Sequence, residues 1–448
     1  MPAGEGPRRA ALMSPLARVL RSARILRVAA QVYGSYKVPE LVNWTLGWTL
    51  GRRNGHGPDH GARAALHRRN AQLIFDTAIE LRGLLIKMCQ VIGTRSDIFP
   101  PEYVKVLSRC HDRLPPRPFE QIRDQVEREL GGRLEQFYSE FDRRPLAAAS
   151  LAQVHRARRR DGRVVAVKVQ YPDIEHIVRV DIDGVTRICR LYQLVDRQPL
   201  DLLPLVAELT THLALELDFQ READNADRVR DLFKDEGYVV VPEMQRDLST
   251  RRVLTMEFVD GIKVTDVAGL RAAGLDPAEV MQTLMRIYVR MILAYGFFQA
   301  DPHPGNLFVR PNGHIVLLDF GLAKDLAPGF GLGMFELMFS MMTLNESAML
   351  KAFEQLGFAT KTGDPQWLVE IARRMVEISG KRFEGEFTED MTQELFTAVR
   401  ENPIVTVPSD FVLVGRAFGL LSGIAHTLGA RANVLEAMSP ASTEPARE

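Results

Sequence analysis

Three polar residues close together in the chain could hold a metal ion and a phosphate group. Asp301 is followed five positions later by Asn306, and Asp319 then opens an Asp-Phe-Gly tripeptide. Carboxylate and amide oxygens can hold Mg²⁺ on bound phosphates, and a further carboxylate can orient the attacking nucleophile. The residue types therefore predict a Mg²⁺–nucleotide site, with Asp301 as the catalytic base and with Asn306 and Asp319 as metal ligands.

A short hairpin must set the separation of Asn306 and Asp319. Residues 308–309 and 315–318 are apolar and flank a turn-forming Pro-Asn-Gly at 311–313, which predicts two short strands. Protein kinases carry the same three polar residues in the same arrangement. A solvated acidic loop before a buried strand would explain Asp-Phe-Gly alone, but the combined spacing favours a nucleotide site.

A lysine in another predicted strand could contact the phosphates. Segments 152–158 and 163–170 flank Asp161-Gly162, which predicts a hairpin, and Lys168 is the only charge among apolar neighbours in the second strand. In a kinase-like lobe such a lysine contacts the α- and β-phosphates and pairs with a glutamate on a helix. An edge-strand lysine with its stem on apolar surface is the alternative.

The loop before this hairpin differs from the glycine-rich phosphate loop of kinases. It consists of Ala147, Ala148, Ala149 and Ser150. Alanines present backbone N–H groups to a phosphate but lack glycine's access to positive φ, so this loop is expected to be stiffer. A plain tight turn is the alternative for this stretch taken alone.

Two predicted helices carry further charged and polar candidates. From residue 71 an apolar stripe recurs at helical steps, and Lys87 and Gln90 lie one above the other on the neighbouring face. A second helix, predicted as continuous over about 200–234, contains Glu216, Asp218 and Glu222. Glu216 and Glu222 are six residues apart and would point to different sides of that helix, so one of them could meet Lys168.

The rest of the chain supplies the frame around these residues. Helices are predicted over 118–141 and 278–298, and a strand over 253–258 leads to a hinge where Glu257 and Val259 are predicted to contact the nucleotide. No Ala-Pro-Glu follows Asp319, so the element that docks peptide substrates in protein kinases is expected to be absent or rebuilt.

Composition describes an ordinary globular chain. Its 448 residues are 46% hydrophobic and 25% charged, with 57 basic and 57 acidic side chains. The balanced charge gives no global field for nucleic acid. The three cysteines lack metal-ligand spacing, which favours a reducing compartment.

Two segments bear on membranes. Residues 6–39 contain no acidic residue and seven basic ones: Arg8, Arg9, Arg18, Arg21, Arg24, Arg27 and Lys37. Such a segment is typical of a basic helix on an anionic membrane, with an organelle transit segment or a solvated leader as alternatives. Residues 411–429 are apolar with glycines at four-residue steps, and we interpret them as a buried helix of the last domain rather than a membrane helix.

Taken together, these residues resemble the UbiB family of atypical kinase-like proteins, also called AarF-domain proteins, over roughly residues 70–430. Members carry a Lys-x-Gly-Gln helix, an Ala-rich loop, a Val-Ala-Val-Lys strand, a Glu-x-Asp motif and an Ala-Asp-Pro-His-Pro-Gly-Asn loop. The chain has IKMCQ at 86–90, AAAS at 147–150, VAVK at 165–168, ELD at 216–218 and ADPHPGN at 300–306. Cys89 stands where the family has glycine, and its side chain could loosen or reposition the helix that covers the nucleotide pocket.

The resemblance implies partners for the candidate residues. Lys168 would pair with Glu222. Lys87 and Gln90 would lie over the active site, tied to Glu216 and Asp218 as regulatory contacts. Asp301, Asn306 and Asp319 would keep the base and metal roles given above.

The predicted fold class is α+β: a bilobal protein-kinase-like fold with an N-terminal helical extension and a helix-rich C-lobe. The predicted domains are a basic leader and linker (1–69), the helical extension (70–141), the N-lobe (142–260), the C-lobe (261–435) and a disordered tail (436–448). Localisation is expected in the cytoplasm, peripheral at the inner face of a membrane: bacterial, or mitochondrial if residues 1–50 are a transit segment.

The expected function is binding and slow hydrolysis of ATP with Mg²⁺, supporting isoprenoid-quinone (ubiquinone-type) or membrane-lipid metabolism; direct protein phosphorylation is not expected. The alternatives are a small-molecule or lipid phosphotransferase and a nucleotide-switched lipid-binding protein with negligible catalysis. Besides ATP, the expected partners are a lipid or quinone-precursor ligand, a membrane surface met by residues 8–37 and a second copy in a homodimer; nucleic acid is not one of them.

Overall fold

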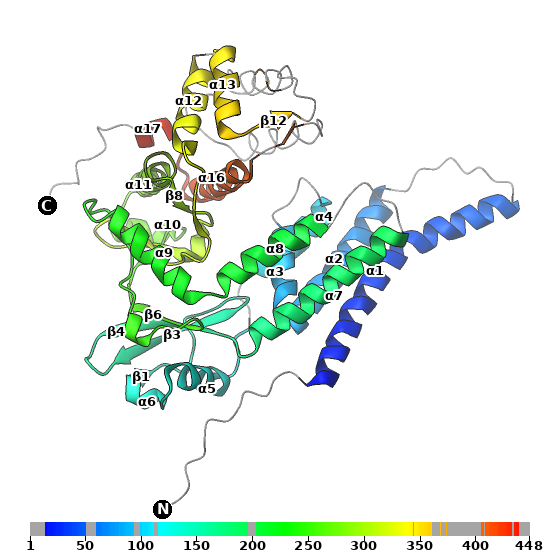
Figure 1. Ribbon diagram of the computed structural model, residues 1–448, viewed down its shortest axis with the longest axis horizontal. Coiled ribbons are helices and arrows are strands. Elements are labelled where there is room, and N and C mark those ends of the chain that lie inside the picture. Colours follow the sequence, from blue (N-terminus) through cyan, green and yellow to red (C-terminus); the bar gives the residue numbers. More distant parts are fainter. Residues whose placement is uncertain are drawn as a thin grey trace, which may run out of the picture. The chain divides into compact units, whose positions relative to one another are not determined.

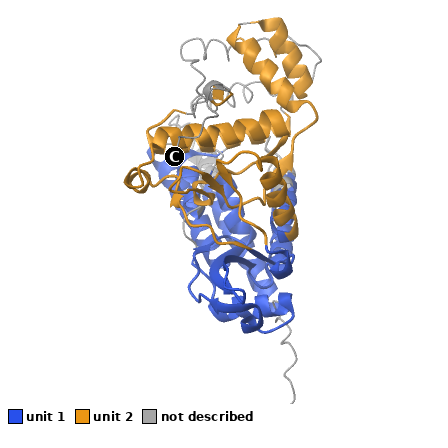
Figure 2. Cartoon of the chain, turned by 90° about the vertical axis from the view of Figure 1, so that its left-hand side faces the viewer, with its two compact units in different colours: residues 1–219, 245–255 blue, residues 220–244, 256–448 orange. Residues whose placement is uncertain are grey.

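The computed structural model describes residues 14–50, 60–93, 99–111, 115–195, 203–343, 345–360, 368, 373, 405–406, 408–431 and 434–438. They belong to two compact units, coloured separately in Figure 2: unit 1 is residues 1–219 and 245–255, and unit 2 is residues 220–244 and 256–448. Residues 1–13 and 51–59 of the predicted leader and linker (1–69), and most of the predicted tail (436–448), lie outside the described residues. The domain boundaries given above stay predictions.

In unit 1, helices precede the first strand of the sheet, and two more come between its fourth strand and its last one (Figure 1). They are α1 (Pro15–Leu50), α2 (His60–Leu81), α3 (Leu84–Ile92), α4 (Pro101–Leu107), the 3-10 helix η1 (Ser108–His111), α5 (Phe119–Leu130), α6 (Leu134–Phe137), α7 (Ile174–Val195) and α8 (Leu203–Glu216). α1 packs against both α2 and α7. The helix predicted from residue 71 corresponds to α2, which begins earlier, at His60.

The helix with an apolar stripe that is predicted from residue 71 is interrupted before Lys87. Arg82 and Gly83 have φ angles of 59° and 69°, so α2 stops and α3 starts in a new direction. Glycine adopts this conformation without strain, whereas arginine does so only where its surroundings compensate. Two helices stand where the periodicity predicted one.

The sheet of unit 1 is antiparallel where its strand pairs are described, and it carries the predicted hairpin. Its strands are β1 (Tyr138–Phe141), β2 (Ala147–Ala148), β3 (Ala152–Arg159), β4 (Val164–Gln170) and β6 (Val253–Glu257), in the order β1-β3-β4-β6 with β2 beside β3. The β3–β4 pairing confirms the hairpin predicted at Asp161-Gly162. The helix predicted over 118–141 is wrong, because Gly131, at φ 74°, ends α5 and the chain then enters α6 and β1.

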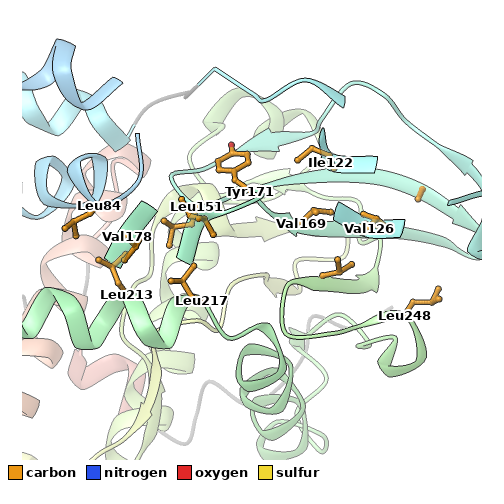
Figure 3. Close-up of a cluster of buried hydrophobic side chains, with 14 of the residues drawn as sticks. Leu84, Ile122, Val126, Leu151, Val169, Tyr171, Val178, Leu213, Leu217 and Leu248 are labelled. Atoms are coloured by element: carbon orange, nitrogen blue, oxygen red, sulfur yellow. The ribbon is translucent and has the colours of Figure 1, made fainter. Parts of the chain in front are cut away.

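A hydrophobic core joins the helices of unit 1 to this sheet. Figure 3 shows Leu84 of α3 near Val178 of α7 and Leu213 of α8, in the same buried cluster as Val169 of β4. Leu84 is 2% exposed and Val169 0%. The first residue of α3 is therefore part of the main core of unit 1.

The helix predicted over 200–234 is two helices, α8 and α9 (Phe219–Leu232). Between them, the side-chain amide of Gln170 donates to the carbonyl of Leu217 at 2.8 Å, and the Phe219 N–H donates to the Arg251 carbonyl at 3.1 Å. These partners take backbone groups that a continuous helix would have used. Glu216 accordingly ends one helix and Glu222 lies in the first turn of the next.

Unit 2 holds most of α9 and the remaining elements. These are β5 (Val239–Val240), β7 (Ile262–Lys263), α10 (Val267–Ala272), α11 (Pro277–Val289), the π-helix η3 (Arg290–Tyr295), β8 (Phe297–Gln299), the 3-10 helix η4 (Pro304–Asn306), β9 (Leu307–Val309), β10 (Ile315–Leu317), β11 (Ala323–Asp325), α12 (Phe330–Met342), α13 (Glu346–Leu356), β12 (Ala359–Thr360), β13 (Val405–Thr406), α16 (Ser409–Leu428) and α17 (Val434–Met438). The helix predicted over 278–298 ends early, because Gly296 is left-handed and turns the chain into β8. The hairpin predicted around 311–313 is confirmed as the antiparallel β9–β10 pair, in a sheet of order β5-β10-β9-β7.

The apolar segment 411–429 forms α16, as predicted. It is the only helix among the described residues that is long and apolar enough to cross a membrane, and 39% of its apolar window is buried. Seven of its side chains, including Val414, Leu421 and Leu428, are buried. A Cβ added at Gly415, Gly419 or Gly423 would meet no atom within 4 Å, so this glycine row is not a close packing face among the described residues.

Candidate functional site

The predicted catalytic loop of unit 2 is folded by its own hydrogen bonds. It leaves β8 and carries Asp301 at its start and Asn306 at its end. The His303 N–H donates to the Asp301 carbonyl at 2.8 Å, and the Asn306 N–H donates to the His303 carbonyl at 2.9 Å. These turns leave the side chains of Asp301 and Asn306 partly exposed.

The β9–β10 hairpin brings the backbone segments of the two predicted metal ligands side by side. The N–H of Leu318, next to Asp319, donates to the backbone carbonyl of Asn306 at 3.1 Å. The Asp319 carboxylate accepts from the Gly321 N–H at 3.0 Å, which fixes the Asp-Phe-Gly turn. An amide and a carboxylate on adjacent backbone segments fit Mg²⁺, which prefers oxygen ligands and keeps positions for phosphate and water.

Two residues that were not predicted from the sequence hold the backbone of Asp319 in place through hydrogen bonds. Gln299 is 1% exposed, and its side-chain amide donates to the backbone carbonyl of Asp319. The hydroxyl of Tyr288 in α11 donates to the side-chain oxygen of Gln299. Complete burial, and then the charge of Asp301, raise the pKa of Tyr288 well above its usual value, so it stays a neutral donor.

A third residue that was not predicted from the sequence lies close to Asp301, the predicted catalytic base. Arg416 of α16 lies with Nη2 3.7 Å from Oδ1 of Asp301. It is the only basic residue between positions 411 and 425, in an otherwise apolar helix. A single charged residue in such a helix could have indicated a functional contact from the sequence alone. The pair would give Asp301 a fixed orientation.

Helix α9 is tied to the Asp-Phe-Gly segment within unit 2. Arg221 donates to the carbonyls of Gly321 at 3.1 Å and Ala323 at 3.0 Å, and Asn225 donates to the Phe320 carbonyl at 3.0 Å. Between them, Glu222 is 2% exposed. Its predicted partner Lys168 belongs to unit 1, and the pairing stays a prediction.

The two predicted hinge residues also lie in unit 2. The Glu257 carboxylate accepts from the Glu243 N–H at 3.3 Å and lies 3.9 Å from Arg310. Val259 is partly exposed in the segment after β6. Their contact with a nucleotide stays a prediction.

In unit 1, Lys168 lies on the sheet face away from the core. Its strand neighbours Val167 and Val169 are fully buried, whereas Lys168 is partly exposed with Nζ 5.1 Å from the centre of the Phe219 ring. This alternation places the lysine where a ligand can reach it.

The alanine-rich loop is held at both ends. Ala147 and Ala148 form β2 beside β3, and the Ala149 N–H donates to the Ala152 carbonyl at 2.8 Å. The Tyr171 hydroxyl donates to the Ala149 carbonyl at 3.1 Å, and Ser150 is 7% exposed. These bonds agree with the stiffness expected of the loop.

The α3 helix brings Lys87 to Glu216, the last residue of α8. Their side chains form an ion pair in which both are 16% exposed. Gln90, one turn on, donates to the carbonyl of Cys110 at 2.9 Å. The contact of Gln90 with Asp218 stays a prediction, as do the functional roles of these residues.

The side chain of Cys89 is accommodated within the helical part of unit 1. It is 1% exposed and hydrogen bonded to the thiol of Cys110, which is 0% exposed. That hydrogen bond and burial raise the pKa of Cys89. The thiol therefore packs against a neighbour in the helical core.

The fold and the residues around Asp301 define a kinase-like protein. A family model described as the ABC1 atypical kinase-like domain matches residues 109–353, so the chain belongs to the ABC1 atypical kinase-like family. That assignment confirms the resemblance and the α+β kinase-like fold inferred from the sequence, and it supports ATP binding of the kinase-like type.

Individual relatives agree. The chloroplastic protein ACTIVITY OF BC1 COMPLEX KINASE 8 of Arabidopsis thaliana is 31% identical over 84% of this chain and 54% of its own length. AarF domain-containing protein kinase 1 of Xenopus laevis is 31% identical over 82% of this chain and 72% of its own. The chain thus spans little more than half of the first of these relatives.

A solved structure shares the fold. The Mycobacterium tuberculosis protein Rv3197, determined in complex with erythromycin, superposes with a TM-score of 0.59 at 22% identity, covering 87% of this chain and 99% of its own. At this identity the likeness concerns the fold alone.

Proposed function

We propose that this protein binds ATP with Mg²⁺ and hydrolyses it slowly, in support of isoprenoid-quinone or membrane-lipid metabolism. The observation that supports the proposal is the Leu318–Asn306 backbone bond at 3.1 Å, because it holds the backbone of Asn306 next to the residue that precedes Asp319 in one unit. Asn306 and Asp319 would hold Mg²⁺, which neutralises charge on the phosphates. Asp301 would orient the attacking water, and Lys168 would contact the α- and β-phosphates.

Measuring phosphate release from ATP by the full chain tests this function. We expect release that needs Mg²⁺ and disappears in Asp319→Asn. ATP consumed without phosphate release would instead support a phosphotransferase that acts on a small molecule or a lipid head group. Tight binding without consumption would support a nucleotide-switched lipid-binding protein. A lipid or quinone-precursor ligand and a homodimer remain proposals.

The proposed pairing of Lys168 with Glu222 predicts coupled mutational effects. Lys168→Ala and Glu222→Ala should each weaken ATP binding, and the double variant should lose less than the sum, with a coupling of about 0.5–3 kcal/mol. Calorimetry on the four proteins measures this. Asp224→Ala is the matched control, because Asp224 is exposed on the same helix and should show no coupling to Lys168. If the losses of ATP affinity for Lys168→Ala and Glu222→Ala were additive, the two side chains would not be partners in the nucleotide site.

Membrane contact is proposed through the outer face of α1. Leu16, Val19, Leu20 and Leu26 are between 50% and 68% exposed and recur at helical spacing, with Arg27 exposed on the same side. An apolar stripe with a basic neighbour fits the surface of an anionic membrane. Arg21 and Arg24, counted above among seven basic residues, have acidic partners within the chain, Asp181 and Glu80, and Arg21 is buried.

Removing the stripe should release the chain from vesicles. Replacing Leu16, Val19 and Leu20 with Ser should lower binding to anionic liposomes more than tenfold, since each apolar side chain contributes about 1.5 kcal/mol or more when buried. Co-sedimentation measures this. Leu146→Ser, at a leucine 52% exposed elsewhere in unit 1, is the control. Equal sedimentation of all three proteins would place α1 away from the membrane.

A further inference from the structure

A buried ion pair in unit 1 joins α1 and α7 at the turn before α3. Arg21 donates to both carboxylate oxygens of Asp181, from Nε at 2.5 Å and from Nη2 at 2.6 Å. The Arg21 side chain is 7% exposed and that of Asp181 is 0% exposed. The two side chains therefore meet face to face, away from solvent.

The same guanidinium caps the end of α2. Arg21 donates from Nη1 to the carbonyl of Leu81 at 2.6 Å and from Nη2 to the carbonyl of Arg82 at 3.0 Å. Carbonyls in the last turn of a helix lack partners within it, so these two bonds satisfy groups that a helix end would leave open. They also accompany the left-handed backbone of Arg82, at φ 59°.

Asp181 acts at the beginning of the next helix. Its carboxylate accepts the backbone N–H of Leu84, the first residue of α3. A negative charge at a helix start is also favoured by the helix dipole. One ion pair thus ends α2 and begins α3.

No free space remains around this turn. A Cβ added to Gly83 would lie 2.9 Å from Cγ2 of Ile177, 3.3 Å from Oδ2 of Asp181 and 3.4 Å from Nη2 of Arg21. Leu84 is in turn buried with Val178 and the rest of the core cluster shown in Figure 3. The start of α3 therefore has one arrangement, set by the ion pair and the core together.

Lys87 lies one helical turn after Leu84, and its amine is ion-paired with Glu216. Because a helix turn is rigid, the position of Leu84 determines where the Lys87 stem begins. We propose that Arg21 and Asp181 are positioning residues that hold α3 so that Lys87 meets Glu216. The functional part of this inference depends on the proposed role of Lys87 over the nucleotide site.

The test removes the ion pair without leaving a buried charge. In the full chain, Arg21→Met combined with Asp181→Leu replaces both charges by apolar groups, a change that buried ion pairs often tolerate. The matched control combines Arg24→Met with Glu80→Leu. That pair, 3.1 Å apart and exposed, also joins α1 to α2 and carries the same net charge, but it does not contact the turn.

The buried thiols report on α3 without any added probe. Cys89 lies on α3 and Cys189 on α7, and both are buried in the parent. Loss of the ion pair should speed labelling of Cys89 by an alkylating reagent about tenfold or more through local opening of α3, while Cys189 keeps its rate. The control variant should label like the parent. Unchanged labelling of Cys89 in the variant overturns the proposal.

Hydrolysis rates test the link to Lys87. Lys87→Ala should change the rate of Mg²⁺–ATP hydrolysis, and the ion-pair variant should change it in the same direction. Adding Lys87→Ala to the ion-pair variant should produce no further change, because both act through one contact. Additive effects, or a rate that Lys87→Ala leaves unaltered, overturn the link.

Two further measurements distinguish unfolding of the variant and failure of the proposed function from failure of the positioning proposal. If the double variant unfolds, shown by rapid labelling of Cys189, Arg21→Lys replaces it, since lysine keeps the charge but not the four hydrogen bonds. Arg21→Lys should then raise Cys89 labelling alone, and parental labelling would overturn the proposal. A parent that does not hydrolyse ATP overturns the proposed function, and the labelling rates then decide the positioning proposal.

Discussion

Asp319→Asn should weaken binding of Mg²⁺–ATP at least tenfold while leaving the fold intact. The substitution removes a charged metal ligand, and one charged contact is worth about 1.5–3 kcal/mol. Shape is kept, because the amide oxygen of asparagine can still accept the hydrogen bond from the Gly321 N–H. The backbone carbonyl of residue 319 keeps its bond from Gln299.

Calorimetry with and without Mg²⁺ measures this loss, which should be confined to the Mg²⁺-loaded nucleotide. Asp325→Asn is the control, because Asp325 follows in the same segment but is exposed and pairs with Arg228. It should bind Mg²⁺–ATP like the parent. A folded Asp319→Asn protein with parental affinity would show that the metal, if bound, is held elsewhere.

Arg21→Met alone should destabilise the protein by about 3–5 kcal/mol, because it leaves a buried carboxylate without its partner. Asp181 has 0% side-chain exposure, so water cannot replace the guanidinium. Adding Asp181→Leu should recover most of the loss, since no charge then remains buried. Urea unfolding of the parent and both variants at neutral pH measures the difference.

Acid should partly rescue the single variant. Burial raises the pKa of Asp181 above its ordinary 3.8, and hydrogen bonds from Arg21 oppose that rise. Without Arg21 the folded carboxyl holds its proton to higher pH than the unfolded one, so the penalty shrinks as pH falls through the folded pKa toward 3.8. Equal destabilisation of single and double variants at every pH would assign the loss to packing instead of charge.

Local chemistry explains which parts of the fold the sequence could predict. The β3–β4 and β9–β10 hairpins were predictable because Asp-Gly at 161–162 and Pro-Asn-Gly at 311–313 favour turns by themselves. The ends of α2 at Leu81 and of α8 at Glu216 were not predictable in this way. Each depends on a side chain far along the chain, Arg21 in the first case and Gln170 in the second.

Some residues of the candidate site were likewise predictable from the local sequence, and others were not. The nearness of Asn306 and Asp319 along the backbone was predictable because one hairpin joins the two residues. Arg416 reaches Asp301 from a helix more than a hundred residues later, and no local rule connects the two. Gln299 was closer to prediction, since a polar side chain in a short apolar strand two residues before Asp301 needs a partner once buried.

The backbone passes from one unit to the other three times, after residues 219, 244 and 255. Neither unit is therefore a continuous stretch of the gene, and no single truncation yields unit 2 alone. A protease that cuts at one crossing splits the chain into two fragments, and at least one of these fragments contains residues of both units. Expressing unit 1 by itself requires a short engineered connection from residue 219 to residue 245. Exchange of units between related chains by simple recombination is restricted for the same reason.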